Sequence, residues 1–332
     1  MISRRGRPAP IAVTMGDPAG VGPELSVLAW RALAKDVPFF IVGDASVLEN
    51  SNDRHSVPLK RISGPQNWDV DYLCVVDSPC PSPVVAGKGQ SHTAAATIRW
   101  IEIAFNLAQS GAASALVTNP INKALLVEGA GFPHPGHTEF LAALDNKDRS
   151  VMMLASPELK VVPVTIHVAL AEVPALLTTD LISATIKTTF KSLQLDFGIA
   201  APRIAVAGLN PHAGENGLMG KEEQELVAPT LDALRAEGID LIGPLSADTM
   251  FHPRARGSYD CAVCMYHDQA LIPIKTIDFD RGVNVTLGLS VVRTSPDHGT
   301  AFDIAGKGIA RPDSLIEAIK LAADMAANRA AA

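Results

Sequence analysis

The segment TMGDPAGVGPEL, residues 14–25, contains the change from strand to helix that decides the fold. Apolar residues before it predict a short strand, and Pro23 suits the first turn of a helix, where its missing N–H is not needed. The segment fails the dinucleotide-binding pattern G-x-G-x-x-G, because Gly20 and Gly22 have the first spacing but the sixth position is leucine. Glu24 adds a carboxylate to the first helical turn, which favours the helix and disfavours a bound pyrophosphate. The stretch therefore predicts a βα unit without a Rossmann cofactor loop.

Working outward from this unit, short apolar runs alternate with helical patterns along the whole chain. The expected strands cover residues 11–16, 39–43, 73–77, 115–118, 151–155, 161–166, 204–209, 260–266 and 283–287, and the expected helices cover 23–34, 93–110, 139–144, 181–193, 222–237 and 314–328. Such alternation predicts an α/β fold with a mostly parallel, helix-covered sheet. We expect a domain break near GFPHPGH, residues 131–137, and a C-terminal helix that packs on the first domain.

The bulk composition limits the classes of function. A chain of 332 residues suggests about two domains, and 47% hydrophobic residues can bury a large core. No run approaches the roughly 18 apolar residues of a membrane helix, and the basic start MISRRGRPAP is not followed by a signal-peptide apolar region. The net charge of −7 without a basic block argues against nucleic acid as the main partner, but allows an anionic metabolite. We expect a cytoplasmic protein.

The cysteines are Cys74, Cys80, Cys261 and Cys264. The CAVC spacing of the last two suits a zinc or redox site, but no second pair is present. Because CAVC lies in an apolar run that reads as a strand, inert core thiols are expected.

Three histidines follow apolar strands: His167 in VTIHVAL, His212 in GLNPHAGENG and His267 in MYHDQ. Strand ends on one edge of a sheet converge, so the three imidazoles are candidates for one catalytic metal site. Zinc or cobalt would suit imidazole, whereas magnesium would prefer oxygen ligands. Three unrelated histidines at strand ends remain the alternative.

A second group of residues suits an anion. In GHTEFLAAL, Thr138 is expected as a helix N-cap with His137 just before it, where backbone N–H groups attract an anion or simply form a cap. The later segment LIPIKTIDFDRGVNVTLGLSVVRTSPDHG adds polar residues beside apolar runs: Lys275, Arg281, Asn284 and Arg293. Together with His137 these residues are candidates for a phosphate site, although each taken alone also fits a solvated surface position.

The glycine-rich segment DHGTAFDIAGKGIARP, residues 297–312, paired with the opening segment, resembles the metal-dependent β-decarboxylating dehydrogenases. The segments VTNPINK, PGHTEFLA, VTIHVAL, GLNPHAGENGLMGKEE, GPLSADTMF, MYHDQALIPIK and GVNVTLGL extend the match, in order, over nearly the whole chain. Together they look like the 4-hydroxythreonine-4-phosphate dehydrogenase family. The resemblance implies an isopropylmalate-dehydrogenase-like fold of two α/β domains with a cleft between them. It also implies a homodimer with a shared active site. We expect one domain over residues 1–133 plus 300–332 and a second over 134–299.

The resemblance also assigns roles to residues. The metal ligands would be His167, His212 and, from the other subunit, His267. The phosphorylated substrate would be bound by His137, Thr138, Lys275, Asn284 and Arg293. The adenosine half of the cofactor would lie on His298, Gly299, Thr300, Ala301, Asp303 and Ile304. Aspartate at position 303 goes with NAD rather than NADP, because a carboxylate accepts hydrogen bonds from ribose hydroxyls and repels a 2′-phosphate.

The implied reaction is metal-dependent, NAD(P)-linked oxidation of 4-phosphohydroxy-L-threonine to 2-amino-3-oxo-4-phosphooxybutanoate. This product decarboxylates to 3-amino-2-oxopropyl phosphate, a step of pyridoxal 5′-phosphate biosynthesis. Candidates for the catalytic base are Asp248, Asp268 and Lys275; orientation of His267 is at least as good a role for Asp268, and phosphate binding suits Lys275. Related enzymes that oxidise D-threonate or D-erythronate 4-phosphate or cis-dihydrodiol dicarboxylates remain alternatives, as do a zinc hydrolase and a non-catalytic anion-binding protein.

Overall fold

The computed structural model describes residues 9–53 and 55–332. The first eight residues, which belong to the basic start where no signal peptide is expected, lie outside the described residues. The chain divides into two compact units, one of residues up to 150 together with 289–331 and the other of residues 151–288. Residues 134–150 and 289–299, which sequence analysis placed in the second domain, belong to unit 1. Among the described residues, no helix is long and apolar enough to cross a membrane.

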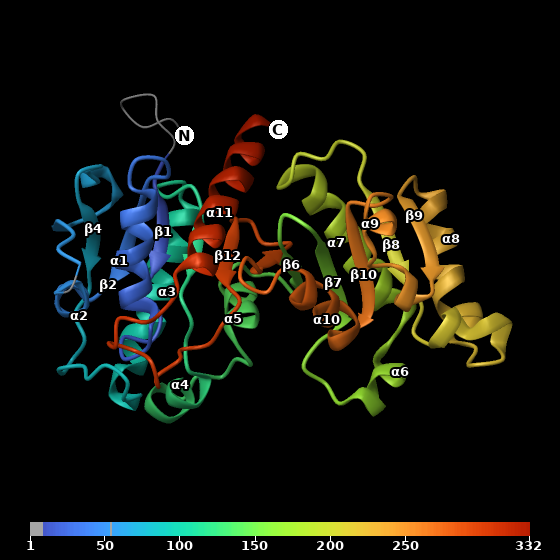
Figure 1. Cartoon of the computed structure of the whole chain (residues 1–332), viewed down its shortest axis with the longest axis horizontal. Coiled ribbons are helices and arrows are strands. Elements are labelled where there is room, and N and C mark those ends of the chain that lie inside the picture. The colour runs from blue at the N-terminus through green and yellow to red at the C-terminus, as the bar shows by residue number, and fades with distance from the viewer. Residues whose placement is uncertain (1–8, 54) are drawn as a thin grey trace. The chain divides into compact units, whose positions relative to one another are not determined.

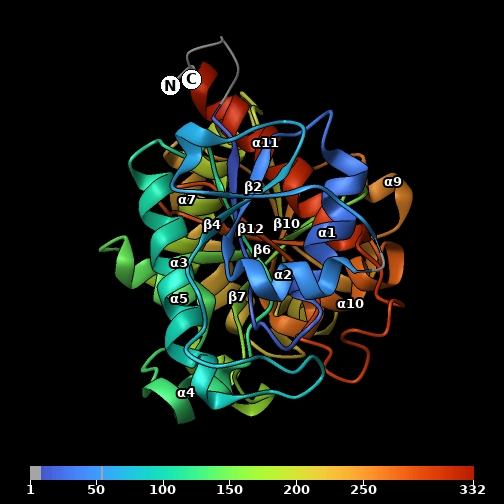
Figure 2. The ribbon, with the colours of Figure 1, turned by 90° about the vertical axis from the view of Figure 1, so that its left-hand side faces the viewer.

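Unit 1 contains six strands in the order β3-β4-β2-β1-β5-β12, and the pairs β3-β4, β4-β2, β2-β1, β1-β5 and β5-β12 are parallel. Its strands are β1 (Ile11–Thr14), β2 (Phe39–Gly43), β3 (Leu59–Ile62), β4 (Leu73–Asp77), β5 (Leu116–Thr118) and β12 (Arg293–Pro296). Its helices are α1 (Gly22–Leu33), α2 (Ala45–Asn52), α3 (Ala94–Gln109), α4 (Lys123–Ala130), α5 (His137–Leu144) and α11 (Asp313–Ala331). Figure 2 shows these strands between α3 on one side and α1 on the other.

Unit 2 contains strands in the order β11-β6-β7-β10-β8-β9. The β7-β10, β10-β8 and β8-β9 pairs are parallel, and β6 is antiparallel to both β11 and β7. The strands are β6 (Val151–Ala155), β7 (Lys160–Thr165), β8 (Arg203–Ala207), β9 (Asp240–Leu245), β10 (Cys261–Tyr266) and β11 (Val283–Leu287). The helices are α6 (Val173–Leu176), α7 (Thr179–Leu195), a π-helical turn (Glu223–Val227), α8 (Ala228–Ala236), α9 (Pro253–Arg256) and α10 (His267–Ile277) (Figure 1). The prediction of an α/β fold with a mostly parallel sheet is confirmed.

Asn119, the first residue after β5, holds the opening segment in place. Asn119 donates from its side-chain amide to Thr14 O at 3.0 Å and to Ser26 Oγ at 3.1 Å, which ties β1 to α1. Gly16 has a φ of +75°, and a Cβ there would meet Pro120 O at 2.5 Å. Only glycine accommodates both the left-handed backbone and this close approach. The turn therefore serves close packing of two strand ends.

The CAVC pair is part of the core of unit 2. Cys261 and Cys264 are free and fully buried. Burial raises the pKa of Cys261 to about 12 and raises the pKa of Cys264 further. Neither thiol ionises near neutral pH, which confirms the expectation of inert core thiols.

Candidate functional site

The three strand-end histidines lie at one edge of the unit 2 sheet. Strands β7, β10 and β8 are neighbours and parallel, so their carboxyl ends lie on the same side. His167 follows β7 by two residues, and His267 is the first residue of α10, directly after β10. The ring centroids of these two histidines are 5.7 Å apart. The topology therefore brings two of the three candidate ligands together.

His212 lies in the segment Pro211–Gly217 that follows β8. His212 and Ala213 have φ values of +52° and +51°, and the left-handed backbone continues to Asn216. Non-glycine residues in this region cost energy and are concentrated at functional sites. Within the described part of the chain, no three His, Cys, Asp or Glu side chains gather as a metal site. The three-histidine site stays a prediction, and the described residues of one chain do not complete it.

Two part-buried sets of hydrogen bonds, made by Glu223 and Gln269, hold the His212 segment in place. Glu223, only 3% exposed, accepts from the backbone N–H of Asn210 at 2.7 Å and from its side-chain amide at 3.0 Å. On the other side, Gln269 donates to Gly208 O at 2.7 Å and accepts from Met265 N–H at 2.7 Å. Gln269 thus joins the end of β8, which leads to His212, to the end of β10, which leads to His267. The sequence carries no local signal for this role except that Gln269 stands two residues after His267.

Replacing Gln269 with leucine removes both hydrogen bonds and leaves Gly208 O and Met265 N–H without partners. We expect a loss of about 1–3 kcal/mol in the free energy of unfolding and a roughly tenfold weaker affinity for zinc or cobalt. Thermal unfolding and a competition titration with a coloured chelator measure the two effects. Gln194→Leu is the matched control, since Gln194 makes one exposed bond to Ala200 O in the same unit. Unchanged metal affinity in the Gln269 variant would contradict the positioning role.

The three candidate bases have different surroundings. The Asp268 carboxylate lies 2.8 Å from Nδ1 of His267, and its side chain is 70% exposed. Asp248, in a 3-10 turn after β9, accepts from the hydroxyl of Ser246. Lys275, in the last turn of α10, lies with its ammonium 5.9 Å from the ring centroid of Phe279. It lines a cavity of about 320 Å³ together with His267 and Asp268. The contact with Nδ1 favours an orienting role for Asp268.

Unit 1 contains a buried cationic site at the end of β5. Arg293, 3% exposed, donates to Thr118 Oγ1 at 2.6 Å, and burial lowers its pKa to about 10, so it is charged at neutral pH. His137 is close enough for the Arg293 charge to act on it, and its buried Nε2 has no hydrogen-bond partner. The charge of Glu139 acts on Arg293, whereas the buried Nε2 of His137 has no partner, which favours a ligand that forms a hydrogen bond there. Thr118, which sequence analysis did not select, belongs to this site.

The expected N-cap at Thr138 is wrong. Helix α5 begins at His137, and its N-cap is Gly136, which makes no side-chain capping bond. Gly136 has an extended backbone, with a φ of −174°, and the helix starts two residues earlier than the threonine pattern indicates. His137 and Thr138 are therefore both within the first turn, where backbone N–H groups are unsatisfied by the helix itself.

The buried state of His137 predicts a pH dependence of stability. Burial, and secondly the charge of Arg293, lower the pKa of His137 well below its usual value of 6.5. The folded state excludes a proton that the unfolded chain binds below about pH 6.5, so this stabilisation is present above that pH and is lost as the pH falls below it. We expect His137→Gln to flatten the fall in unfolding free energy between about pH 6.5 and 5 by up to about 1.4 kcal/mol per pH unit. Denaturant unfolding at several pH values measures this slope. The exposed His92, changed to Gln, is the control, and equal slopes for wild type and His137→Gln would refute the expectation.

The predicted cofactor loop lies against the opening segment. The backbone N–H of Val21 donates to Thr300 O at 3.0 Å, and Gly20 lies so close that a Cβ would meet that oxygen at 2.8 Å. Ala301 has a φ of +43°, while His298 Nδ1 lies 3.0 Å from Gly299 O. Asp303 is exposed. These residues and Ile304 form an irregular loop, and their contact with a cofactor stays a prediction.

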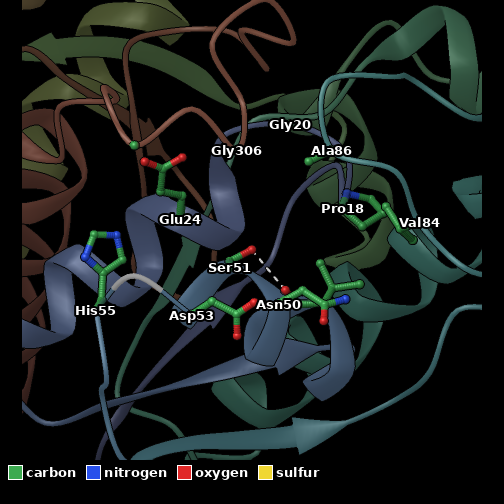
Figure 3. A pocket seen from close by; sticks show the side chains of 12 residues that line it. Pro18, Gly20, Glu24, Asn50, Ser51, Asp53, His55, Val84, Ala86 and Gly306 are labelled. Carbon is green, nitrogen blue, oxygen red and sulfur yellow. Dashed lines mark hydrogen bonds between the residues drawn. The ribbon is translucent and has the colours of Figure 1, made fainter.

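A cavity of about 290 Å³ lies beside this loop (Figure 3). We call it the α1–α2 cavity; its lining residues are Pro18, Gly20, Glu24, Val47, Asn50, Ser51, Asp53, His55, Val84, Ala86, Gly306 and Gly308. Glu24 is 5% exposed, and neither carboxylate oxygen has a hydrogen-bond partner. The sequence alone predicts that this carboxylate stabilises the helix and disfavours a pyrophosphate, but it does not show that the carboxylate is buried without a partner.

The structure defines the class as an α/β protein whose polar side chains gather after the carboxyl ends of parallel strands, which is where such folds bind their ligands. The chain belongs to the family described as pyridoxal phosphate biosynthetic protein PdxA, whose model matches residues 35–322. It is 55% identical to the 4-hydroxythreonine-4-phosphate dehydrogenase of Roseobacter denitrificans, over 96% of this chain and 98% of that protein.

Solved structures of similar proteins agree with this family membership. The 4-hydroxythreonine-4-phosphate dehydrogenase of Klebsiella pneumoniae is 40% identical with a TM-score of 0.87, over 96% of this chain and 99% of that one. A terephthalate 1,2-cis-dihydrodiol dehydrogenase from Burkholderia xenovorans is less similar, at 29% identity and a TM-score of 0.68, over 96% and 98% of the two chains.

Proposed function

We propose that the protein is a 4-hydroxythreonine-4-phosphate dehydrogenase acting in pyridoxal 5′-phosphate biosynthesis. It oxidises the C3 hydroxyl of 4-phosphohydroxy-L-threonine, with NAD or NADP as the hydride acceptor. Membership of the PdxA family and the name of the relative from Roseobacter denitrificans support this substrate.

The buried Arg293 is the observation that carries the proposal. A guanidinium at 3% exposure, next to an imidazole nitrogen without a partner, fits a dianionic phosphate, because charge-assisted bonds from arginine offset the cost of burying the charge. Arg293, His137 and Thr138 are proposed to bind the phosphate from unit 1. Lys275 and Asn284 stay predicted ligands of the phosphate, and the buried Oδ1 of Asn284 has no hydrogen-bond partner.

The proposed metal ligands are His167, His212 and His267. Their nitrogen donors fit zinc or cobalt better than magnesium, and a bound divalent cation would supply Lewis acidity that favours ionisation of the substrate hydroxyl. Asp268 holds the imidazole of His267 through Nδ1, which leaves Nε2 to face a ligand.

In the proposed reaction, the C3 hydrogen leaves as hydride and the hydroxyl proton passes to a base, for which Asp248, Asp268 and Lys275 remain the candidates. The product, 2-amino-3-oxo-4-phosphooxybutanoate, is a β-keto acid. It loses CO₂ and leaves 3-amino-2-oxopropyl phosphate.

We further propose a homodimer that shares its active sites, with His267 contributed by the partner. Several large apolar side chains of unit 2 are exposed, among them Leu170 at 68%, Leu218 at 84% and Phe279 at 71%. Exposed apolar groups of this size support a protein contact on this unit. The cytoplasmic location stays a prediction.

A spectrophotometric assay tests the function. Enzyme, zinc or magnesium, and NAD or NADP are mixed with 4-phosphohydroxy-L-threonine, and absorbance of the reduced cofactor is followed. We expect a signal with this substrate and a weaker one with D-threonate 4-phosphate, D-erythronate 4-phosphate or a cis-dihydrodiol dicarboxylate. A stronger signal with one of these other compounds would make that compound the proposed substrate. No signal with any of the four would favour a hydrolase or a binding protein.

A further inference from the structure

We infer that Asp145 is a positioning residue for the phosphate site, which fixes the segment that contains His137 relative to the segment that contains Arg293. Asp145 follows α5 directly, and its partner Ser290 lies three residues before Arg293, the first residue of β12. The inference rests on the proposed function for the role of His137 and Arg293. It gives a function to a buried carboxylate that the proposed reaction does not use.

The contact between Asp145 and Ser290 is the first observation. Asp145 is 7% exposed, its Oδ2 accepts from the backbone N–H of Ser290 at 2.7 Å, and its Oδ1 accepts from the Ser290 hydroxyl. Hydrogen bonds to an ionised acceptor are about twice as strong as neutral ones. We call this pair the Asp145–Ser290 clamp. It ties the end of α5 to the segment that leads into β12.

Two short segments lead from the clamp to the phosphate site. Helix α5 rises about 1.5 Å per residue, so its start at His137 lies roughly 12 Å from Asp145. An extended chain spans at most about 3.6 Å per residue, so Arg293 lies within roughly 11 Å of Ser290. Burial, and secondly the charge of Arg293, lower the pKa of His137. The two segments therefore lie close together at both of their ends.

Both segments are packed against the core of unit 1. Leu141 in α5 is fully buried, and Val292, directly before Arg293, is 3% exposed. The carbonyl of Val292 also accepts from the N–H of Leu116 in β5 at 2.9 Å, which holds this segment on the sheet. Close-packed elements transmit a shift instead of absorbing it. Loss of the clamp therefore moves α5, and with it His137, relative to the arginine on the sheet.

The clamp lies at the connections between the two units. Unit 2 begins at Val151, and unit 1 resumes at Leu289. Within unit 2 the two connections are tied by the pairing of Val151 with Leu287. Within unit 1 they are tied by the clamp, and Arg329 of α11 adds bonds to Ser290 O at 2.9 Å and to Leu289 O at 3.3 Å. These bonds give the Ser290 backbone a fixed place, against which Asp145 can hold α5.

Titration of the full chain with inorganic phosphate, followed by phosphorus NMR, tests the clamp without turnover. We expect Asp145→Ala to weaken phosphate binding about tenfold, because both hydrogen bonds to Ser290 are lost. Asp145→Asn should restore most of the affinity. Its amide oxygen can accept from the Ser290 N–H, and its amide nitrogen can donate to the Ser290 hydroxyl.

Steady-state kinetics separates positioning from a general loss of stability. Asp145→Ala should raise KM for 4-phosphohydroxy-L-threonine about tenfold and leave kcat within about twofold, because the clamp acts on binding of the phosphate. Asp196→Ala is the matched control. Asp196 is 1% exposed and directly follows α7 of unit 2, so its loss should lower the midpoint of thermal unfolding without raising KM.

A second variant covers the case in which Asp145→Ala fails to fold. Ser290→Ala removes the hydroxyl donor and keeps the backbone N–H, so we expect phosphate binding about threefold weaker than in wild type. Added to Arg293→Met, the same change should raise KM no further, because the guanidinium relative to which His137 is positioned is then absent.

Four outcomes overturn the inference: no phosphate binding by the wild-type chain, unchanged phosphate affinity in either clamp variant, an equal rise in KM in Asp196→Ala, or an undiminished effect of Ser290→Ala on top of Arg293→Met. The assay of the proposed function is independent. Turnover with an unchanged KM in the clamp variants keeps the function and removes the clamp, whereas clamp-dependent phosphate binding without turnover does the reverse.

Discussion

His212→Ala is expected to lower kcat by about a thousandfold or more, because a metal centre contributes several kcal/mol to such reactions and each 1.36 kcal/mol is a factor of ten. His212 is the candidate ligand in the left-handed turn, and His167, the other proposed ligand of the same subunit, follows the strand β7. The measurement is the initial rate of cofactor reduction at saturating substrate, with metal content determined on the same samples.

Two controls separate loss of metal from loss of fold. His92→Ala changes an exposed histidine of unit 1 and should leave rate and metal content unchanged. Thermal unfolding of His212→Ala in the presence of a chelator should match that of wild type under the same conditions. A His212→Ala enzyme that keeps normal rates with chelator present would remove the ion from the reaction.

Arg293→Met is the second change with a large expected effect. It removes the buried guanidinium and keeps side-chain volume, so KM for the phosphorylated substrate should rise about 10²–10³-fold, through lost charge-assisted bonds to phosphate. The free energy of unfolding should fall by about 1–3 kcal/mol, because Thr118 and the other partners of the guanidinium lose it; the matched rise in KM, and not the loss of stability, is the readout of phosphate binding. Steady-state kinetics and thermal unfolding measure the two effects.

Thr118→Val tests the same phosphate site with a smaller expected effect. Thr118 accepts one N–H of Arg293 at 2.6 Å, so valine leaves the guanidinium charged but less well fixed, and we expect roughly a tenfold rise in KM. Arg99→Met is the matched control, because Arg99 is an exposed arginine bonded to Ser78 and Pro79. An unchanged KM in Arg293→Met would place the phosphate elsewhere.

The sequence predicts the buried parallel strands well, because each is a short apolar run with turn residues on both sides. It misses β3, β9 and β12 for different reasons. In β3 the exposed Arg61 lies between Leu59 and Ile62 at the edge of its sheet, so no apolar run stands out. Strand β9 contains Gly243 and Pro244, which are tolerated there because it is also an edge strand.

Strand β12 was missed because its buried residues are polar. Arg293 and Thr294 are at most 3% exposed, and each forms a hydrogen bond to a residue distant in sequence: Thr118 for the arginine and Ala318 for the threonine. No local pattern contains those partners. The same reason explains why Thr118 and Gln269 were not selected, whereas histidines directly after apolar strands were.

Helix α10 was missed because Pro273 lies inside it. Proline removes one helical hydrogen bond and usually ends a helix, so MYHDQALIPIK reads as a strand followed by a loop. The structure keeps the helix because Ala270, Leu271 and Ile274 bury one face in the core of unit 2. Tertiary packing thus overrides the local signal and moves Lys275 onto a helix.

The order of segments along the chain has a consequence for synthesis. Unit 1 needs β12 and α11, which follow unit 2, and Thr294 of β12 is bonded to Ala318 of α11. A ribosome therefore delivers every residue of unit 2 before it delivers the last strand of unit 1. During translation, the edge of β5 that pairs with β12 therefore stays unpaired in unit 1, while all the strands of unit 2 have already been synthesised.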